Sequence, residues 1–288
     1  MSNKILITGG TGFIGGNLIN SINAENHIIN IGRNKNLICD NILWNLEDKL
    51  DGLFLNNVDV IIHCASIVGN QNISKSKYMD INVKSTLELL EFGLKNNIKK
   101  FILISTGGVY GFSKKKLSEN DICNAKEIYS LSKYFSEKLC ELYKDKISIV
   151  ILRLFFPYGE GQKGRLISNL CNDIFKKKKI MLSKNGQPII NPVHIADVVN
   201  IIKNIIEDDL DGTYNICGNE FLSIEQICRK IAVIQNVDDV QFTYGDNDVD
   251  NLMGNGEKIC KALNYTMQKN LDEGLKLFLK SLKGEGEI

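Results

Sequence analysis

Tyr129 and Lys133 stand four residues apart in the segment YSLSK, a spacing that places both side chains on one face of a helix. An ammonium group beside a phenol stabilises the phenolate, so Tyr129 could exchange a proton with a hydroxyl or a ketone near neutral pH. The spacing alone is not selective, because three other pairs share it: Tyr110/Lys114, Tyr134/Lys138 and Tyr265/Lys269.

The context of Tyr129 selects it from these pairs. Tyr129 begins the helical segment that follows the strand-like run Phe101–Ser105, and the hydroxyls of Ser105 and Thr106 lie where that run ends. A hydroxyl at this edge can orient a reacting oxygen. A surface tyrosine on a dimer-forming helix and a threonine in a turn are the simpler interpretations of Tyr129 and Thr106.

A glycine-rich turn, TGGTGFIG, follows the first strand-like run and opens a helical segment at Phe13. Gly9 would allow the tight turn, Gly12 would let backbone N–H groups approach a pyrophosphate, and Gly15 would let the helix pack closely on the sheet. The alternative is a strand-to-helix turn with incidental glycines. In this context the spacing predicts a dinucleotide-binding turn.

The end of the second strand-like run indicates which dinucleotide is preferred. An acidic residue there would bind the ribose 2′-hydroxyl of NAD, but the segment reads IGRN and has no carboxylate. Arg33 can stack on adenine and pair with a 2′-phosphate, which favours NADP over NAD. The alternative is an exposed arginine in a turn.

Strand-like and helical segments alternate through the first half of the chain. The strand-like runs are Ile5–Thr8, Ile28–Ile31, Val58–His63, Phe101–Ser105 and Ser148–Leu154, and the helical segments are Phe13–Ile22, Tyr78–Leu94 and Ile128–Tyr143. This pattern predicts an α/β fold with a Rossmann-type doubly wound parallel sheet. We expect a dinucleotide-binding domain over 1–155, to which part of 183–210 returns, and a smaller mixed α/β substrate lobe over 156–288.

Composition argues against several other classes of protein. The 288 residues include 35 Lys+Arg and 34 Asp+Glu, and this balance lacks the basic excess of nucleic-acid-binding proteins. Apolar runs are too short for membrane insertion, and no secretory signal pattern opens the chain. Eight scattered cysteines and three histidines form no metal-binding spacing. We therefore expect a cytoplasmic protein with reduced thiols and without a metal site.

Taken together, the motifs resemble the extended short-chain dehydrogenase/reductases, the NAD(P)-dependent group of nucleotide-sugar epimerases, dehydratases and reductases. The similar segments are TGGTGFIG (8–15), HCAS (63–66), YMDINVKST (78–86), ISTGGVYG (104–111), YSLSK (129–133), LRLFFPYGEGQ (152–162), NPVHIADV (191–198) and YNICG (214–218). The resemblance covers nearly the whole chain.

The resemblance implies a role for each matching position. The cofactor-binding set becomes Gly9, Gly12, Phe13, Ile14, Gly15, Arg33, Asn45, Leu46, Cys64, Ala65, Ser66, Ser105, Tyr129 and Lys133. The catalytic group becomes Thr106, Tyr129 and Lys133. The substrate, a nucleotide-diphosphate sugar, would meet Ser66, Thr106, Phe156, Arg165 and Asn191. Asn82 would support the site, and segments 78–94 and 128–143 would form a homodimer as a four-helix bundle, as in many relatives. Packing within the chain is the alternative explanation of the apolar stripe on segment 128–143. From their positions in the sequence, His63 and His194 are interpreted as structural.

Two departures from the family pattern narrow the activity. Gly107 and Gly108 stand where 4,6-dehydratases carry acidic residues, which argues against dehydration, and Phe156 replaces the usual Asn. We therefore expect NADP(H)-dependent reduction of the C4 keto group of a nucleotide-activated deoxy sugar, for cell-surface polysaccharides. The alternatives are a 4-epimerase or 4-dehydrogenase with tightly bound NAD(H), and a non-catalytic protein that senses NAD(P).

Overall fold

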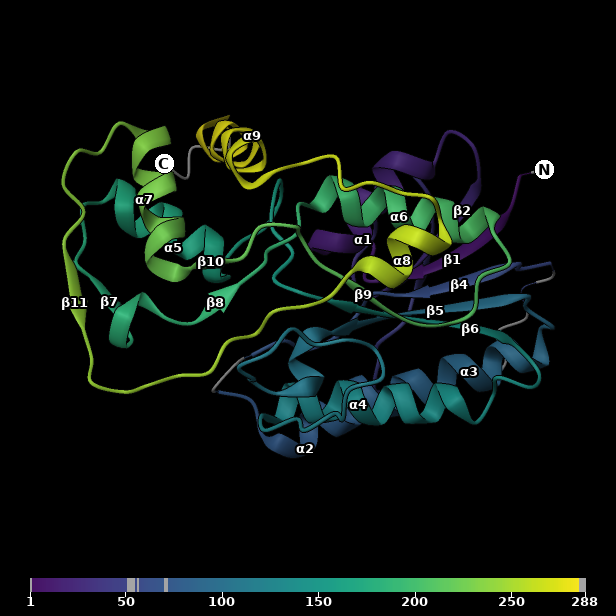
Figure 1. Cartoon of the computed structure of the whole chain (residues 1–288). Helices are drawn as coiled ribbons and strands as arrows, with labels where there is room; N and C mark the ends of the chain where they lie inside the picture. The colour runs from purple at the N-terminus through teal and green to yellow at the C-terminus, as the bar shows by residue number, and fades with distance from the viewer. Residues whose placement is uncertain (1, 51–54, 56, 70–71, 285–288) are drawn as a thin grey trace. The chain divides into compact units, whose positions relative to one another are not determined.

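A computed structural model of the chain describes residues 2–50, 55, 57–69 and 72–284 (Figure 1). The chain forms two compact units. The first comprises Met1–Val109, Cys123–Arg153 and Ile202–Tyr214, and the second comprises Tyr110–Ile122, Leu154–Ile201 and Asn215–Ile288. All the catalytic and cofactor-binding candidates lie in the first unit, whereas Phe156, Arg165 and Asn191 lie in the second.

The main sheet has seven strands in the order β3-β2-β1-β4-β5-β6-β9. Its strands are β1 (Lys4–Thr8), β2 (His27–Gly32), β3 (Asp40–Leu43), β4 (Val60–His63), β5 (Lys100–Thr106), β6 (Ser148–Leu154) and β9 (Gly212–Ile216). The β1–β2, β1–β4, β2–β3 and β4–β5 pairs are parallel. Strand order reverses between β1 and β4, so the predicted doubly wound fold is confirmed and the ends of these two strands flank the switch point.

Helices connect the strands of the first unit. They are α1 (Phe13–Ile22), α2 (Lys75–Tyr78), the π-helix η1 (Met79–Lys84), α3 (Ser85–Lys95), the 3₁₀ turn η2 (Gly107–Tyr110), α4 (Ile128–Glu141) and α6 (Ile195–Glu207), of which η2 and α6 extend into the second unit. The predicted continuous helix over 78–94 is therefore wrong in one respect, because a π-helix interrupts it. Such interruptions are frequent at functional sites.

Apolar side chains from strands and helices form the core of the first unit. Leu6, Ile61 and Phe101 from the sheet and Leu89 from α3 are fully buried in one cluster. The strands β1, β4 and β5 are buried along nearly their whole length. This burial on both faces is why their sequences read as continuous apolar runs.

The second unit is a smaller mixed assembly of helices and short strands. Its elements are α5 (Leu166–Phe175), β7 (Ile180–Leu182), η3 (Lys184–Gly186), β8 (Ile189–Ile190), β10 (Leu222–Ser223), α7 (Ile224–Gln235), β11 (Phe242–Tyr244), α8 (Glu257–Ala262) and α9 (Leu271–Gly284). The β10–β8 pair is antiparallel and the β11–β7 pair is parallel. Tyr158, Ile227 and Phe278 are among the buried side chains that form its core.

Candidate active site

The glycine-rich turn between β1 and α1 has the geometry of an anion-binding cradle. Gly9 adopts φ +71°, and a Cβ there would lie 2.9 Å from the backbone nitrogen of Ala65. A Cβ on Gly15 would lie 2.4 Å from the carbonyl oxygen of Gly9. Helix α1 begins after Gly12 without a capping side chain and without an acidic residue in its first turn. These features fit the pyrophosphate of a dinucleotide, which backbone N–H groups at a helix N-terminus bind well.

A buried hydrogen-bond network connects the residue before this turn to β4 and to the segments that follow it. Thr8 Oγ1 accepts a hydrogen bond from the Ala65 nitrogen at 3.1 Å and lies 2.7 Å from His63 Nδ1. His63 Nε2 lies 3.4 Å from Ser85 Oγ. Burial, and then the charge of Lys133, hold the pKa of His63 well below its usual value. His63 is thus a neutral core histidine with both ring nitrogens paired, as predicted.

Asparagine amides connect the turn to the end of β2. Asn30 Oδ1 accepts a hydrogen bond from the Gly10 nitrogen at 3.1 Å, and its Nδ2 donates to the Asn34 carbonyl at 3.0 Å. Asn36 Nδ2 donates to the Gly10 carbonyl at 2.8 Å. Arg33 is exposed in the segment that these amides hold. The segment carries two exposed basic side chains, Arg33 and Lys35, and no carboxylate.

The residues that follow β3 and β4 are placed along the same sheet edge. Asn45 and Leu46 are half-buried, and Leu46 packs on the core of the first unit. Cys64, Ala65 and Ser66 are also half-buried. Burial raises the pKa of the Cys64 thiol to about 12, so this side chain is a neutral thiol.

Asn82, inside the π-helix, fixes the segment after Ser66. Its Oδ1 accepts from the Ile67 nitrogen at 2.8 Å, and its Nδ2 donates to the Ile67 carbonyl at 3.0 Å and to Ser132 Oγ at 2.9 Å. Asn82 is fully buried. One amide thereby holds the loop after β4 against α4, which agrees with the supporting role that the family resemblance implied.

Thr106 and the N-terminal part of α4 come together around Gly108. Thr106 Oγ1 accepts a hydrogen bond from the Gly108 nitrogen at 3.1 Å. A Cβ on Gly108 would lie 2.5 Å from Ser130 Oγ and 3.4 Å from Thr106 Oγ1. Ser130 directly follows Tyr129, so Thr106 and the first turn of α4 flank the same glycine. A side chain at position 108 would require Ser130 Oγ to move.

Lys133 lies one turn further along α4 and is 1% exposed. Burial lowers its pKa to about 8. Among the residues that the structure describes, none forms a hydrogen bond with Lys133 Nζ. A buried ammonium without such partners is costly to the fold, but it suits a site where a ligand's hydroxyl groups supply them. Lys133 therefore fits the ribose of a nicotinamide dinucleotide.

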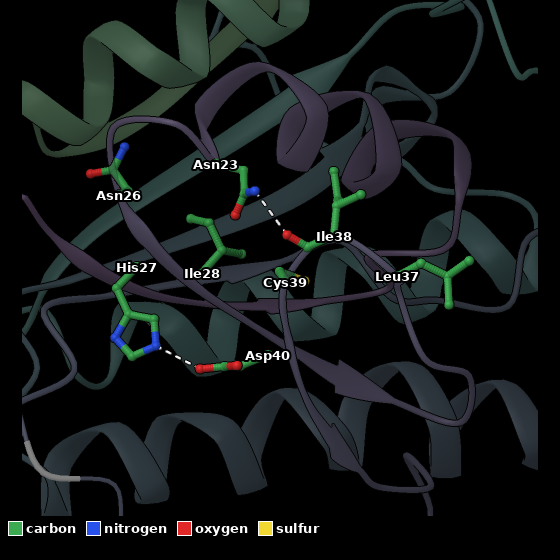
Figure 2. A pocket seen from close by; sticks show the side chains of 8 residues that line it. All are labelled: Asn23, Asn26, His27, Ile28, Leu37, Ile38, Cys39 and Asp40. Atoms are coloured by element: carbon green, nitrogen blue, oxygen red, sulfur yellow. Dashed lines mark hydrogen bonds and ion pairs between the residues drawn. The ribbon is translucent and has the colours of Figure 1, made fainter.

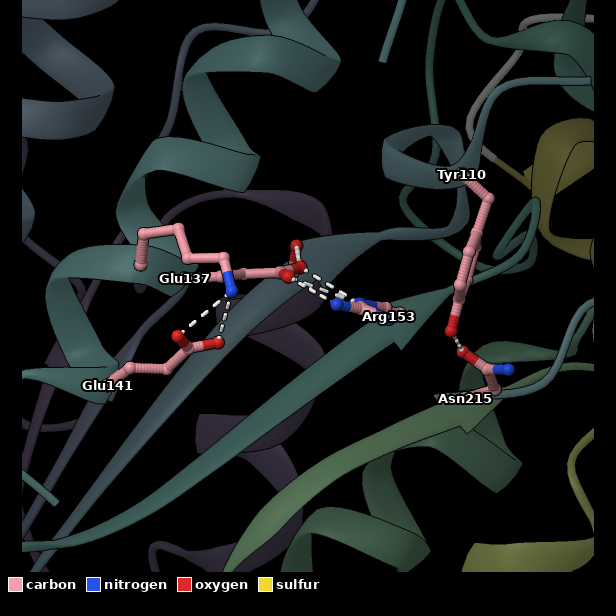
Figure 3. Close-up of polar contacts among 7 residues, drawn as sticks. Tyr110, Glu137, Glu141, Arg153 and Asn215 are labelled. Atoms are coloured by element: carbon pink, nitrogen blue, oxygen red, sulfur yellow. Dashed lines mark hydrogen bonds and ion pairs between the residues drawn. The ribbon is translucent and has the colours of Figure 1, made fainter. Parts of the chain in front are cut away.

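The prediction from sequence missed Glu137, which lies four residues after Lys133 and is 1% exposed. Its carboxylate accepts hydrogen bonds from Ser105 Oγ of β5 and from Arg153 of β6, whose Nη2 lies 2.7 Å from Oε2 (Figure 3). The spacing from Lys133 was a visible signal, but nothing in the sequence showed that this glutamate would be buried.

The three predicted substrate residues of the second unit differ in burial and in their contacts. Phe156 has φ +45°, a left-handed conformation that is strained for an aromatic residue, and it packs on the core of that unit. Arg165 is exposed at the start of α5. Asn191 is fully buried, and its amide is bonded to the Gly218 carbonyl and to both backbone groups of Gly254, at 2.9 Å each. Substrate contact by these three residues stays a prediction.

His194 and Asp197 hold together part of the second unit. Asp197 accepts hydrogen bonds from Tyr265 Oη at 2.6 Å, the Gln268 nitrogen at 2.7 Å and the Lys269 nitrogen at 3.1 Å. The ring of His194 packs edge-on against Tyr158 at 5.3 Å. These contacts agree with the structural interpretation of His194.

An open hollow of about 400 Å³ lies beside β2 and β3 (Figure 2). Its lining includes His27 and Asp40, whose Nε2 and Oδ2 atoms lie 2.7 Å apart, and Asn23, which donates to the Ile38 carbonyl at 2.8 Å. None of the predicted site residues lines it. Within the described residues there is no cluster of metal-ligating side chains and no helix able to cross a membrane.

Comparison with known proteins identifies the family. The model of the NAD dependent epimerase/dehydratase family matches residues 5–217. An uncharacterized UDP-glucose epimerase of Bacillus subtilis is 28% identical over 94% of this chain and 95% of its own. A GDP-6-deoxy-D-talose 4-dehydrogenase of Aggregatibacter actinomycetemcomitans is 26% identical over 90% of this chain and 91% of its own.

Solved structures agree with these sequence matches. The UDP-glucuronic acid 4-epimerase of Bacillus cereus, in complex with UDP-glucuronic acid and NAD, is 25% identical and superimposes with a TM-score of 0.88 over 98% of this chain and 99% of its own. With the glycine cradle and the buried lysine in place, the match settles the resemblance inferred from the motifs. This chain belongs to the NAD dependent epimerase/dehydratase family, a group of extended short-chain dehydrogenase/reductases.

Proposed function

We propose that the protein reduces the C4 keto group of a nucleotide-diphosphate sugar with NADPH. The observation that carries this proposal is Lys133, a buried ammonium without a hydrogen bond among the described residues, one turn from Tyr129 on α4. When bound, the nicotinamide dinucleotide supplies a hydride to C4. The protein must supply the proton and stabilise the oxygen as its charge develops.

The chain's own side chains divide this work. Tyr129 donates its phenolic proton to the C4 oxygen, and water returns a proton to the phenolate after the alcohol leaves. Thr106 donates a hydrogen bond to the same oxygen. Lys133 as an ammonium stabilises the phenolate of Tyr129 and binds the ribose hydroxyls. The reaction balances, because one hydride and one proton convert the ketone to an alcohol.

The space around Gly108 argues against 4,6-dehydration. That reaction needs an acid beside the threonine to expel a hydroxyl, and here a Cβ at 108 would already lie 2.5 Å from Ser130 Oγ. Arg33 supports NADP, because an exposed guanidinium with no carboxylate nearby in β2 favours a 2′-phosphate. The substitution Arg33→Glu tests this point and is expected to reverse the ratio of kcat/KM for NADPH and NADH.

The experiment is to supply purified protein with NADPH and 4-keto nucleotide sugars and follow absorbance at the nicotinamide band. Consumption of NADPH that Tyr129→Phe abolishes is the expected result. If the wild-type protein consumes no NADPH with any 4-keto nucleotide sugar, the reductase proposal fails.

A 4-epimerase with tightly bound NAD(H) is the second candidate. It is favoured by the Bacillus cereus 4-epimerase, which was solved with NAD and superimposes over nearly the whole chain. Such an enzyme would retain its dinucleotide through purification. It would invert C4 of UDP-glucose or UDP-glucuronic acid with no added cofactor, which NMR of the sugar detects. Tyr129→Phe without effect on biological activity would instead support a non-catalytic sensor.

We also propose that the protein is a homodimer formed by α3 and α4. The two helices lie side by side in the first unit (Figure 1). The side chains of Leu87 in α3, Phe135 in α4 and Leu142 directly after α4 are 38%, 40% and 75% exposed. Two copies of this surface would pair as a four-helix bundle. Sedimentation of the wild-type protein as a dimer and of Phe135→Glu as a monomer is the expected outcome.

A further inference from the structure

Glu137 joins three elements of the first unit through one buried carboxylate. It lies in α4, one helical turn after Lys133. Its Oε1 accepts from Ser105 Oγ of β5, and both of its oxygens accept from Arg153 Nε of β6 at 3.2 Å (Figure 3). Ser105 directly precedes Thr106. The same carboxylate thus connects the helix that carries Tyr129 and Lys133 to the strand that ends in Thr106.

We propose that Glu137 is a positioning residue for Lys133: Ser105 and Arg153 fix its carboxylate, which holds α4 against β5 and places a charge one helical turn from Lys133. This inference rests on the proposed function, because Lys133 has the role assigned to it only in the proposed reaction. Glu137 acts through Lys133 and touches neither the dinucleotide nor the sugar. A purely structural ion pair between α4 and β6 is the competing explanation.

The groups around Lys133 single out Glu137 as the source of negative charge. Burial lowers the pKa of Lys133 to about 8, whereas Cys140, Glu137 and Cys64 raise it. Burial raises the pKa of Cys64 to about 12 and that of Cys140 further, so both thiols are neutral at pH 7. His63 is neutral as well. Of these neighbours, Glu137 is the one that forms an ion pair, with Arg153.

The groups around Glu137 itself are Arg153 on β6 and the thiol of Cys123. The Arg153 side chain is 8% exposed and its ion pair with Glu137 is 2.7 Å long. The ion pair gives each buried charge a partner of opposite sign, which either group alone would lack.

The test compares Glu137→Gln with Glu141→Gln. Glu141 lies one turn further along α4, pairs with Lys138 at 2.8 Å and is 49% exposed, so it is a matched control on the same helix (Figure 3). The readout is the pKa of Lys133, measured by NMR titration of its Nζ and Cε resonances. A charge about one helical turn away changes this pKa by about one to two pH units at an effective dielectric constant near 20.

We expect Glu137→Gln to lower the pKa of Lys133 by that amount and Glu141→Gln to leave it unchanged. Where NADPH is consumed, kcat at pH 7 should fall about two- to tenfold, and its alkaline limb should move to lower pH by the same amount. An unchanged Lys133 pKa in Glu137→Gln overturns the proposal and leaves the ion pair structural.

Glu137→Gln leaves Arg153 as an unpaired buried cation, which endangers folding. The double variant Glu137→Gln/Arg153→Met removes both charges and is compared with Arg153→Met, so that only residue 137 differs: a lower Lys133 pKa in the double variant supports the proposal, and an equal one overturns it. The titration uses no sugar. A wild-type protein that turns over no nucleotide sugar would therefore refute the proposed function while the titration still decides the role of Glu137.

Discussion

Replacement of Lys133 by methionine should stabilise the protein while abolishing its activity. Lys133→Met keeps the length of the side chain and removes an ammonium that is 1% exposed. Burial lowers the pKa of this lysine from 10.5 to about 8, a difference that corresponds to about 3 kcal/mol against the folded state at pH 7. We expect the free energy of unfolding to rise by up to this amount, because methionine has no charge to desolvate.

The effect of Lys133 on the free energy of unfolding depends on pH, and its direction follows from the lowered pKa. Between pH 8 and 10.5 the unfolded chain binds more protons at this position than the folded chain, so the wild-type protein gains stability as the pH rises through this window. Lys133→Met lacks that gain. The difference between the two proteins should therefore be largest at pH 7 and should shrink above pH 8.

Urea unfolding of dinucleotide-free protein, followed by the fluorescence of Trp44 at several pH values, measures both quantities. Lys138→Met is the matched control, since Lys138 lies on the same helix with its side chain 49% exposed. Its effect should stay within about 0.5 kcal/mol at every pH. A Lys133→Met protein less stable than the wild type at pH 7, or a difference that does not change with pH, would refute the reasoning.

Three further predictions follow from the site. Gly15→Ala places a Cβ 2.4 Å from the Gly9 carbonyl and should weaken dinucleotide binding at least tenfold in a fluorescence titration, whereas Gly16→Ala, whose Cβ meets only an ordinary contact at 3.5 Å, should change it little. Asn82→Ala breaks three hydrogen bonds of a buried amide and should cost about 2–3 kcal/mol of unfolding free energy, measured by urea denaturation. Gly108→Asp should abolish NADPH consumption without creating dehydratase activity, because its Cβ would meet Ser130 Oγ at 2.5 Å; appearance of a dehydrated product would contradict this.

The sheet could be predicted because its strands are buried on both faces. β1, β4 and β5 show this as continuous apolar runs, and the positions of the glycine turn and of Thr106 followed from where the runs end. β3 lacks such a run, since its burial is only partial, and hydropathy did not reveal it. The π-helix could not be predicted either, because its side-chain pattern differs from that of an α-helix by a single inserted residue.

The sequence could not show which polar side chains of the site would be buried, and this limited the prediction of the site residues. Tyr129 and Lys133 were found from spacing and context, and the buried setting of Lys133 strengthens that prediction. Glu137 and Asn30 were missed, because a glutamate on a helix and an asparagine in a strand are most often exposed. Only the tertiary contacts with Ser105, Arg153 and Gly10 show that both are buried and paired.

The burial of Cys64 has a consequence for the chemical resistance of the protein. Only a thiolate reacts readily with alkylating agents or oxidants, and a pKa raised to about 12 leaves Cys64 as a thiol at pH 7. We therefore expect iodoacetamide and peroxide to modify Cys64 slowly at pH 7, at a position where a more acidic cysteine would react readily.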